Sequence, residues 1–581
     1  MKMSTRLRVL IWGSVLGGFP LMGLSQTASS PTPVAPVPNP CTPRFAPGST
    51  IQKPPALFSR NGVLSVRFSY QQTTDSLGNP VHCFMTPDGI QEPTLHVNPG
   101  DTLNITVTNN TPALPFGETF NAPNCGDTTV QFPPGTPTMP NPNGIASIGS
   151  SVNIHYHGTN VTPQCGGDNV TKTLINSGST FQYNFKFPTN EPPGVYWYHP
   201  HVHGLAERDI LGGATGALIV DGIQNVQPAV QGLSQRLLIV RDQTSIFGAG
   251  AEVMNCGNGI PFQDLSVNYV PIVSFQNSDG SIGFTPAVLH MQQGATEFWR
   301  VVNSAADTIL DLQVMYDEVP QTMQIVSIDS VPVNSQEGPQ PGKLIRVTRF
   351  RLPVAGRVEF LVNAPASTVK VAQLVTNNIN TGPQGDCDPT RALFNISLTQ
   401  GEDRPATPDD RVPKLTALNT QQQRFGGAAL DDHSTTRTLQ FSEIQPTQFF
   451  ITVAGQNPVL FDNNNPPAIV THQGAMEKWI VQNKAQENHE FHMHQIHFKV
   501  LSQDNFEVNG TTQAPAIDNQ FLDMVEVPFW DNVKNPNGPV PDVQLMMDFR
   551  GMDIGDFVYH CHILSHEDLG MMAIIRVKSN E

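Results

Sequence analysis

The stretch His560-Cys-His-Ile-Leu-Ser-His-Glu-Asp-Leu-Gly-Met571 guides the interpretation of the whole sequence. It supplies a thiol at Cys561, an imidazole at His566 and a thioether at Met571, each five residues after the one before. A thiolate combined with imidazoles and a weak thioether ligand is typical of blue copper sites, whereas zinc has no redox chemistry and would make no use of the thioether. The stretch therefore predicts a copper site rather than a structural zinc site.

Histidines separated by a single residue are unusually frequent in this chain. Its 17 histidines would give about 0.5 His-x-His pairs by chance. Residues i and i+2 of a strand point to the same face, so each pair presents two imidazoles to one metal or to two adjacent metals. We therefore predict metal binding by five such pairs, which are His155/His157, His199/His201, His201/His203, His492/His494 and His560/His562.

Three segments begin with a turn glycine, continue as an alternating strand and end at an asparagine nine residues on. They are Gly100–Asn109, Gly294–Asn303 and Gly474–Asn483, and their starts lie 194 and 180 residues apart. This near-equal spacing predicts three homologous β domains. A second glycine-to-strand pattern recurs later in each third of the chain, at Gly194–His199, Gly356–Leu361 and Gly555–His560.

The copies differ in the residues that could bind metal. In the third copy, histidines follow the asparagine at offsets of 6, 9 and 11 residues, whereas the middle copy has Ile309, Leu312 and Val314 at these offsets. In the later pattern, the middle copy has Leu361 and Asn363 where the third has histidines. The sequence thus predicts metal ligands in the first and third domains and none in the middle domain.

Length and composition favour a mostly β protein with several domains. The chain has 581 residues, and a single hydrophobic core rarely extends beyond ~250–300 residues. Its 51 prolines and 47 glycines favour turns over long helices. The net charge of −17 argues against a nucleic-acid partner, because a polyanion would be repelled.

The N-terminus has the features of an export signal. Basic residues at positions 2, 6 and 8 precede an apolar run from Val9 to Leu24, and small residues stand before a cleavage site near Ser25. The run is short for a membrane span of ~20 residues. The mature chain is therefore expected to have no membrane span and to be periplasmic or secreted.

Seven cysteines fit an exported protein. Six of them lie in loop-like sequence and can form up to three disulfides, with 15 possible connectivities, in an oxidising compartment. These six are Cys41, Cys83, Cys125, Cys165, Cys256 and Cys387.

Four motifs together resemble those of the three-domain multicopper oxidases of laccase type. They are His155-Tyr-His-Gly158, His199-Pro-His201, His489-Glu-Phe-His-Met-His494 and the stretch around Cys561, and the resemblance covers about residues 61–577. It implies an all-β chain of three cupredoxin-like Greek-key β-barrel domains. We expect a signal peptide at 1–25, a Pro-rich tether at 26–60, domains at 61–225, 226–400 and 436–581, and a linker at 401–435.

The resemblance also implies four copper ions per chain, held by motif residues of the first and third domains. The blue copper would take His489, Cys561 and His566, with Met571 as axial ligand. The type 2 copper would take His155 and His492. One type 3 copper would take His157, His199 and His562, and the other His201, His494 and His560.

Two residues depart from the family pattern. Glu490 and Gln495 stand where the third motif commonly has proline and glycine, which leaves the ligand set intact but the local loop shape open. Two further histidines, His203 and His497, match no ligand position and are interpreted as neighbours of the ligands or as structural. A structural role is also expected for His82, His96, His290, His433 and His472.

The family resemblance implies a route for electrons and a need for protons. Electrons taken singly at the blue copper would pass through Cys561 to its neighbours His560 and His562, and four of them would reduce one O2 to two waters. Asp168 resembles the family's acidic residue near the type 2 copper, and Glu567 resembles the glutamate that delivers protons in bacterial members. The alternative is that either one is a solvated loop carboxylate.

Small phenols and aromatic amines are the expected reductants, and the enzyme is expected to be monomeric. Oxidation of Cu(I) or Fe(II) is the main alternative, which the dispersed methionines disfavour, because clustered thioethers are the soft ligands that Cu(I) prefers. A non-enzymatic copper-binding relative and a two-domain copper nitrite reductase are further alternatives. The complete ligand set and the three copies argue against both.

Overall fold

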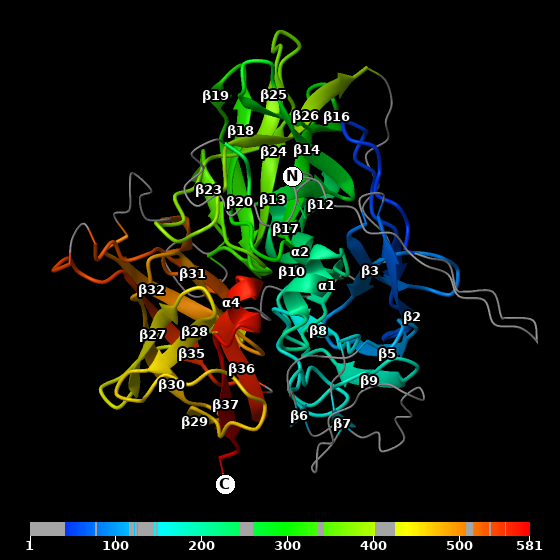
Figure 1. Cartoon of the computed structure of the whole chain (residues 1–581). Coiled ribbons are helices and arrows are strands. Elements are labelled where there is room, and N and C mark those ends of the chain that lie inside the picture. Colours follow the sequence, from blue (N-terminus) through cyan, green and yellow to red (C-terminus); the bar gives the residue numbers. More distant parts are fainter. Residues whose placement is uncertain are drawn as a thin grey trace, which may run out of the picture. The chain divides into compact units, whose positions relative to one another are not determined.

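The alternating apolar residues form strands that assemble into three pairs of sheets in this computed structural model (Figure 1). The structure describes residues 41–580, except for 76–77, 115–120, 123–124, 126–144, 147–148, 245–258, 335–341, 401–423, 507–514, 534–535 and 552. The predicted signal peptide, residues 26–40 of the tether, Cys256 and most of the 401–435 linker lie outside the described residues.

The first pair of sheets combines a sheet of order β3-β2-β5-β9 with one of order β1-β4-β11-β10-β8. Alternate residues of β5 are buried, and they join residues of β10 and β11 in one apolar core. The strands are β1 (Ala56–Phe58), β2 (Val63–Thr74), β3 (Pro80–Met85), β4 (Thr94–Val97), β5 (Thr102–Asn109), β8 (His155–His157), β9 (Thr180–Lys186), β10 (Gly194–His199) and β11 (Gly216–Val220). A separate ribbon joins β6 (Asn121–Ala122) to β7 (Ile145–Ala146).

The second pair has one sheet of order β15-β14-β13-β12-β17-β24-β20-β21, to which β22 adds, and one of order β16-β26-β25-β18-β19, to which β23 adds. Trp299 of β17 contacts Phe394 of β26 and so links the two sheets. The strands are β12 (Ser234–Thr244), β13 (Gln263–Val267), β14 (Val270–Gln276), β15 (Ile282–Thr285), β16 (Ala287–Gln292), β17 (Thr296–Asn303), β18 (Leu310–Tyr316), β19 (Val319–Pro320), β20 (Met323–Ile328), β21 (Val331–Pro332), β22 (Ile345–Val347), β23 (Phe350–Leu352), β24 (Arg357–Asn363), β25 (Ala372–Thr376) and β26 (Arg391–Thr399).

The third pair joins a sheet of order β28-β27-β30-β35-β32-β33 to one of order β29-β37-β36-β31-β34. Trp479 of β30 contacts Phe491 of β31 and Tyr559 of β36 across the core. The strands are β27 (Thr436–Ile444), β28 (Gln448–Val453), β29 (Ile469–His472), β30 (Met476–Asn483), β31 (His489–Met493), β32 (Phe498–Asp504), β33 (Phe521–Leu522), β34 (Met524–Val527), β35 (Asp542–Asp548), β36 (Gly555–Cys561) and β37 (Met572–Lys578).

Helices are few and short in the described residues. They are α1 (Ala206–Leu211), α2 (Ile223–Val226), α4 (Leu564–Asp568) and the 3-10 turns η1 (Pro228–Val230) and η3 (Pro515–Ile517). The prediction of an all-β fold is therefore confirmed. None of the helices within the described part of the chain has the length and apolar character that crossing a bilayer requires.

The three Gly-to-Asn segments occupy the same place in their sheets. They form β5, β17 and β30, each of which pairs in parallel with the first long strand of its sheet, namely β2, β12 and β27. Each asparagine is fully buried, and its Nδ2 donates to at least two backbone carbonyls. Its Oδ1 accepts the N–H two residues on. The asparagine therefore holds the loop that follows the strand, and in the third pair that loop leads to His489.

The later sequence pattern does not align the second pair with the other two, and this prediction is wrong. β36 pairs with β31 and β37, and β10 pairs with β8 and β11 in the same way. β24, which contains Leu361 and Asn363, instead pairs with the Gly-to-Asn strand β17. The strand of the second pair that matches β36 is β25, where Thr376 lies opposite Leu312 as His560 lies opposite His492. A turn glycine followed by an apolar strand was too general a pattern to fix the alignment.

Two disulfides lie in the part of the chain that precedes β10. They join Cys41 to Cys83 and Cys125 to Cys165. Cys387 is also disulfide-bonded. Cys561 is a free, buried thiol, as its place between two histidines predicted.

Candidate metal centre

Four strands from two different pairs of sheets carry most of the motif histidines. In the first pair, His155 of β8 lies opposite His199 of β10. In the third pair, His492 of β31 lies opposite His560 of β36. His157 shares β8 and its face with His155. The second histidines of the other pairs follow within two residues of the ends of β10, β31 and β36.

Eight of these histidines meet in one buried group, which we call the histidine cluster. Sets of their ring nitrogens lie within 4.8 Å of one another, and no side chain of the group is more than 2% exposed. His560 Nε2 lies 3.2 Å from His494 Nε2 and 3.3 Å from His201 Nε2, so residues of both pairs of sheets converge. The members are His155, His157, His199, His201, His492, His494, His560 and His562.

Most of these rings have one nitrogen that is hydrogen-bonded to the protein and one nitrogen that has no such partner. The Nδ1 atoms of His199, His492 and His560 bond to the backbone carbonyls of Pro200, Asp523 and Cys561 at 2.8–2.9 Å. Nitrogens of His155, His157, His199, His201, His492, His494 and His562 are buried without a hydrogen-bond partner in the described structure. Buried nitrogens without partners are costly unless something else binds them, so the cluster fits metal ions.

Six imidazoles of the cluster are kept neutral, as metal ligands must be. Burial lowers the pKa of His155, His157, His199, His492, His494 and His562 well below the usual value, and neighbouring rings lower it further. Neutral imidazole suits copper, zinc, iron and nickel.

A second site combines a thiol with two imidazoles. Cys561 Sγ lies 3.7 Å from His489 Nδ1 and 3.8 Å from His566 Nδ1, and the two ring nitrogens are 3.0 Å apart. Met571 is fully buried, and its backbone O accepts the N–H of Cys561 at 3.0 Å. We call His489, Cys561 and His566 the thiol site. Its ligand types are those of a blue copper centre, while a zinc site would leave the histidine cluster without a role.

The two sites are joined through the backbone of β36. Cys561 belongs to the thiol site, and its covalent neighbours His560 and His562 belong to the histidine cluster. Burial raises the pKa of the Cys561 thiol well above its usual value, so a bound cation is needed to hold it ionised. The arrangement gives electrons a path of a few bonds from one site to the other.

Both acidic residues singled out in the sequence contact the histidine cluster. Asp168 Oδ2 lies 2.8 Å from His155 Nδ1, and burial raises the pKa of Asp168 to about 7. Glu567 is fully buried, with its carboxylate 3.1 Å from His560 Nδ1 and 3.4 Å from His201 Nδ1. Neither residue is a solvated loop carboxylate.

The two departures from the family pattern have structural reasons. Gln495 has a φ of +60°, a left-handed conformation in which glycine is commonest, and its amide donates to Asp168 Oδ2 at 2.6 Å. The N–H of Glu490 lies 3.4 Å from Cys561 Sγ, a contact that proline has no N–H to make. Its side chain accepts the N–H of Val354 from the second pair.

The remaining histidines have other partners. His203 packs against Phe461, and His497 contacts Asn160 and lies 3.5 Å from Asp523. His82 contacts Tyr70, His96 contacts Asp221 and His290 contacts Thr50. His433 and His472 are exposed.

Three acids near the metal centre were missed in the sequence. Asp523 Oδ1 lies 3.2 Å from His157 Nε2. Glu443 lies 3.6 Å from His489 Nε2, and Glu487 lies 3.5 Å from His566 Nε2. No motif marks these positions, since they are brought to the histidines only by folding. Of the three acids, Glu487 lies nearest to a recognised pattern, because it follows Asn483 by four residues.

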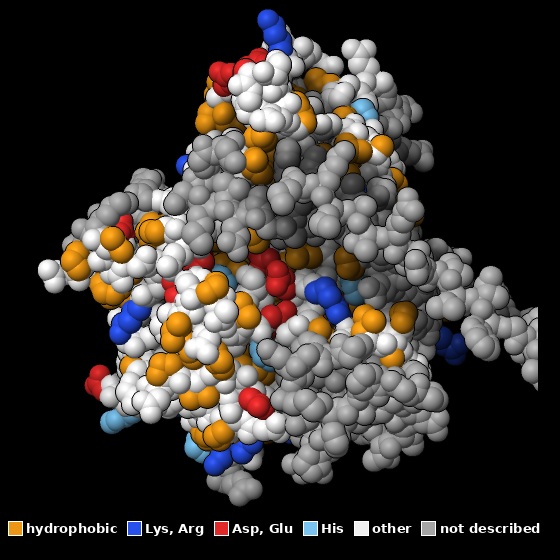
Figure 2. Space-filling model, in the orientation of Figure 1, with side chains coloured by type: hydrophobic (Ala, Val, Ile, Leu, Met, Phe, Trp, Pro, Cys, Tyr) orange, Lys and Arg blue, Asp and Glu red, His pale blue; other side chains and the backbone are white. Residues whose placement is uncertain are grey.

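Acidic side chains gather beside the thiol site. Figure 2 shows them over the region where Figure 1 places α1 and α4. Asp307 is 4% exposed, accepts the N–H of Ser565 at 3.0 Å and has an Oδ2 atom without a hydrogen-bond partner. Burial raises the pKa of Asp307 well above its usual value, and nearby carboxylates raise it further. We call this group the acidic cluster: Glu207, Asp242, Asp307, Asp386, Asp388, Glu487 and Asp568.

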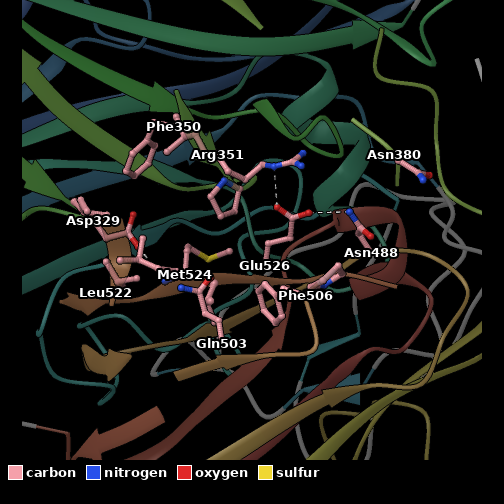
Figure 3. A pocket seen from close by; sticks show the side chains of 16 residues that line it. Asp329, Phe350, Arg351, Asn380, Asn488, Gln503, Phe506, Leu522, Met524 and Glu526 are labelled. Atoms are coloured by element: carbon pink, nitrogen blue, oxygen red, sulfur yellow. Dashed lines mark hydrogen bonds and ion pairs between the residues drawn. The ribbon is translucent and has the colours of Figure 1, made fainter. Parts of the chain in front are cut away.

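A pocket opens between β23 of the second pair and β34 of the third (Figure 3). Phe350, Phe506 and Met524 give it apolar walls. Figure 3 shows Glu526 between Arg351 and Asn488, at 3.5 and 2.7 Å. Asn488 immediately precedes His489, so the pocket borders the backbone of the thiol site.

Comparison with known proteins finds relatives in one family of copper enzymes. Two family models described as multicopper oxidase match residues 143–225 and 432–581. The multicopper oxidase LPR1 homolog 1 of Oryza sativa subsp. japonica is 22% identical over 491 residues, which cover 77% of this chain and 78% of the relative. The laccase of Bacillus subtilis is 22% identical over 440 residues, covering 72% of this chain and 78% of the relative.

Solved structures share the fold. The McoA multicopper oxidase of Aquifex aeolicus superimposes with a TM-score of 0.62 at 18% identity, covering 91% of this chain and 99% of that one. A multicopper oxidase of Campylobacter jejuni described as a metallo-oxidase gives a TM-score of 0.60 at 20% identity, covering 92% and 96%. The three pairs of sheets are therefore cupredoxin-like.

Proposed function

We propose that this chain, which belongs to the multicopper oxidase family, takes single electrons from a small reductant at the thiol site and reduces O2 to water at the histidine cluster. The single observation that carries this proposal is the end of strand β36, where Cys561 of one site lies between His560 and His562 of the other. A simple copper carrier would have no need for that connection.

We assign the ligands as the family resemblance implies. The thiol site would hold the blue copper, with the thioether of Met571 as a further ligand. Among the remaining ligands, His201, His494 and His560 already lie within 4.8 Å of one another, as one type 3 copper requires. Copper ions, when bound, supply the one-electron redox chemistry that O2 reduction needs. The chain contributes neutral imidazoles, the exclusion of water by burial, and the carboxylates Asp168 and Glu567 to accept and pass on protons.

Copper content and oxygen chemistry test this function together. We expect about four copper ions per chain after reconstitution, an intense blue colour and water as the product of O2 reduction. The measurements are metal analysis, visible absorption and O2 consumption with a peroxide assay. Two or fewer coppers, or hydrogen peroxide as the main product at full loading, would contradict the proposal.

The reductant is proposed to be a metal cation, Cu(I) or Fe(II), which revises the order of preference that the sequence suggested. The acidic cluster contacts the thiol site, since Glu487 lies 3.5 Å from His566 and Asp307 accepts the N–H of Ser565, the residue before it. Carboxylates can bind metal cations, which displace their protons, but they give no advantage to neutral phenols. Aromatic reductants remain the second candidate, because the apolar pocket of Figure 3 borders Asn488.

Removing one carboxylate should separate the two classes of reductant. For Asp307→Asn we expect kcat/KM for Fe(II) or Cu(I) to fall about tenfold or more, because a cation that displaces the proton of Asp307 can bind its partnerless Oδ2, whereas an amide is a weaker ligand. A neutral phenol should be oxidised as before. Steady-state O2 consumption with each reductant measures both.

The fully exposed Asp279, between β14 and β15, offers a control, since Asp279→Asn makes the same substitution outside the acidic cluster. Equal loss of phenol and metal oxidation in Asp307→Asn would show that Asp307 acts on the thiol site itself. Unchanged metal oxidation would return aromatic reductants to first place.

We also propose that the protein is exported to the periplasm or secreted. The disulfides Cys41–Cys83 and Cys125–Cys165 support this, because such bonds persist in oxidising compartments.

A further inference from the structure

Asp523 contacts two histidines of the histidine cluster, one from the first pair of sheets and one from the third. It lies between β33 and β34 and is fully buried. Its Oδ1 is 3.2 Å from Nε2 of His157, from the first pair of sheets. Its backbone O accepts Nδ1–H of His492, from the third pair, at 2.8 Å. The two imidazoles stack with their centroids 4.0 Å apart.

Each of these contacts uses one ring nitrogen and leaves the other for a metal. His157 Nδ1 and His492 Nε2 are buried and have no hydrogen-bond partner in the described structure. A carboxylate and a carbonyl only accept hydrogen bonds, so both contacted nitrogens must carry the proton. Asp523 thereby selects the tautomer in which the remaining nitrogens have free lone pairs.

Asp523 is itself held by an arginine from the second pair, which supplies no predicted ligand. Arg357, the first residue of β24, donates to Asp523 Oδ1 at 2.6 Å and to Oδ2 at 2.5 Å. The guanidinium is fully buried and also donates to the carbonyl of Val195 and the hydroxyl of Ser330. Because Arg357 donates to both oxygens, the carboxylate is fixed in plane and direction.

The glycine of the first motif makes room for this pair. Gly158 follows His157 and has a φ of +83°. A Cβ at this position would collide with the guanidinium of Arg357 and the carboxylate of Asp523. The His-Tyr-His-Gly sequence is thus shaped by contacts with residues from both other pairs of sheets.

We infer that Asp523, clamped by Arg357, is a positioning residue that fixes the tautomer and orientation of His157 and His492 for metal binding. The second pair of sheets thereby takes part in building a metal centre to which it gives no ligand. This inference rests on the proposed function only in that the histidine cluster holds copper.

Asp523→Asn tests the inference with little change in shape. An amide has one acceptor oxygen where the carboxylate has two, so it cannot serve both N–H groups of Arg357 and also His157. Loss of a residue that orients metal ligands typically weakens metal affinity about 10- to 100-fold. We expect a chelator to remove cluster copper at a concentration lower by that factor, while the blue absorption persists. The type 2 electron paramagnetic resonance signal and the blue absorption report the two sites separately.

Glu359→Gln is the matched control. Glu359 lies on β24 two residues from Arg357, and its buried ion pair with Arg300 has an N–O distance of 3.3 Å. This variant should lose stability without selective loss of cluster copper. If Asp523→Asn does not fold, Arg357→Lys gives the same comparison, since lysine keeps the charge but not the two-pronged contact.

The outcomes are distinct. Wild-type cluster affinity in Asp523→Asn or in Arg357→Lys, or equal loss of blue and cluster copper, would overturn the positioning role. A wild-type chain that takes up no cluster copper would instead contradict the proposed function.

Discussion

Cys561→Ser is expected to abolish the blue colour and all turnover while the chain still folds. The colour arises from charge transfer between a thiolate and Cu(II), and a serine hydroxyl cannot supply it. The substitution also breaks the electron path between the two sites. β36 keeps its pairing with β31 and β37, so the fold should persist. Visible absorption and O2 consumption measure the loss, and circular dichroism checks the fold.

The type 2 signal of the histidine cluster serves as an internal control for this variant. All eight histidines of that cluster remain in Cys561→Ser, so its copper should still bind. A blue and active serine variant would refute the thiol site. Loss of the copper signals from both sites would point to misfolding rather than to the loss of a ligand.

Those site residues that could be predicted from sequence share one property: their spacing along the chain sets their spacing in space. The His-x-His pair on β8 presents both imidazoles to one face whatever surrounds it. The same holds for the asparagine that ends each of β5, β17 and β30. Short-range patterns of this kind survive in the linear sequence.

Contacts between pairs of sheets could not be predicted in this way. Asp523 and Arg357 are 166 residues apart, and each lies in an unremarkable stretch. The members of the acidic cluster are scattered along the chain between residues 207 and 568, and they form no recognisable motif in the sequence. Each depends on how three sheet pairs dock, which is decided by packing over the whole core and not by local spacing.

The alignment of the second pair failed for a related reason. Without histidines, its strands retain only a turn glycine and apolar residues, which recur in any β protein. Pairing shows that Thr376 takes the place of His560. The position that corresponds to His560 therefore lies in β25, which follows the segment that the pattern suggested.

Glu567→Gln is expected to slow O2 reduction by about 10²-fold, the usual loss when a positioned acid–base group is removed. The Glu567 carboxylate is fully buried and lies 3.1 Å from His560 Nδ1 and 3.4 Å from His201 Nδ1. From this position it would accept a proton and pass it on to the cluster. Glutamine keeps the size of the side chain but cannot do this.

The measurement is a two-stage stopped-flow experiment on the copper-loaded protein. Bleaching of the blue colour by reductant without O2 should be nearly unchanged, because Glu567 contacts histidines of the cluster and not those of the thiol site. Recovery of the colour after O2 is added should be slow. Glu191→Gln, which neutralises another buried carboxylate that bonds to Asn160, should leave both stages unaffected. Impaired bleaching with normal recovery would place Glu567 on the reductant side, and normal rates in both stages would remove it from proton transfer altogether.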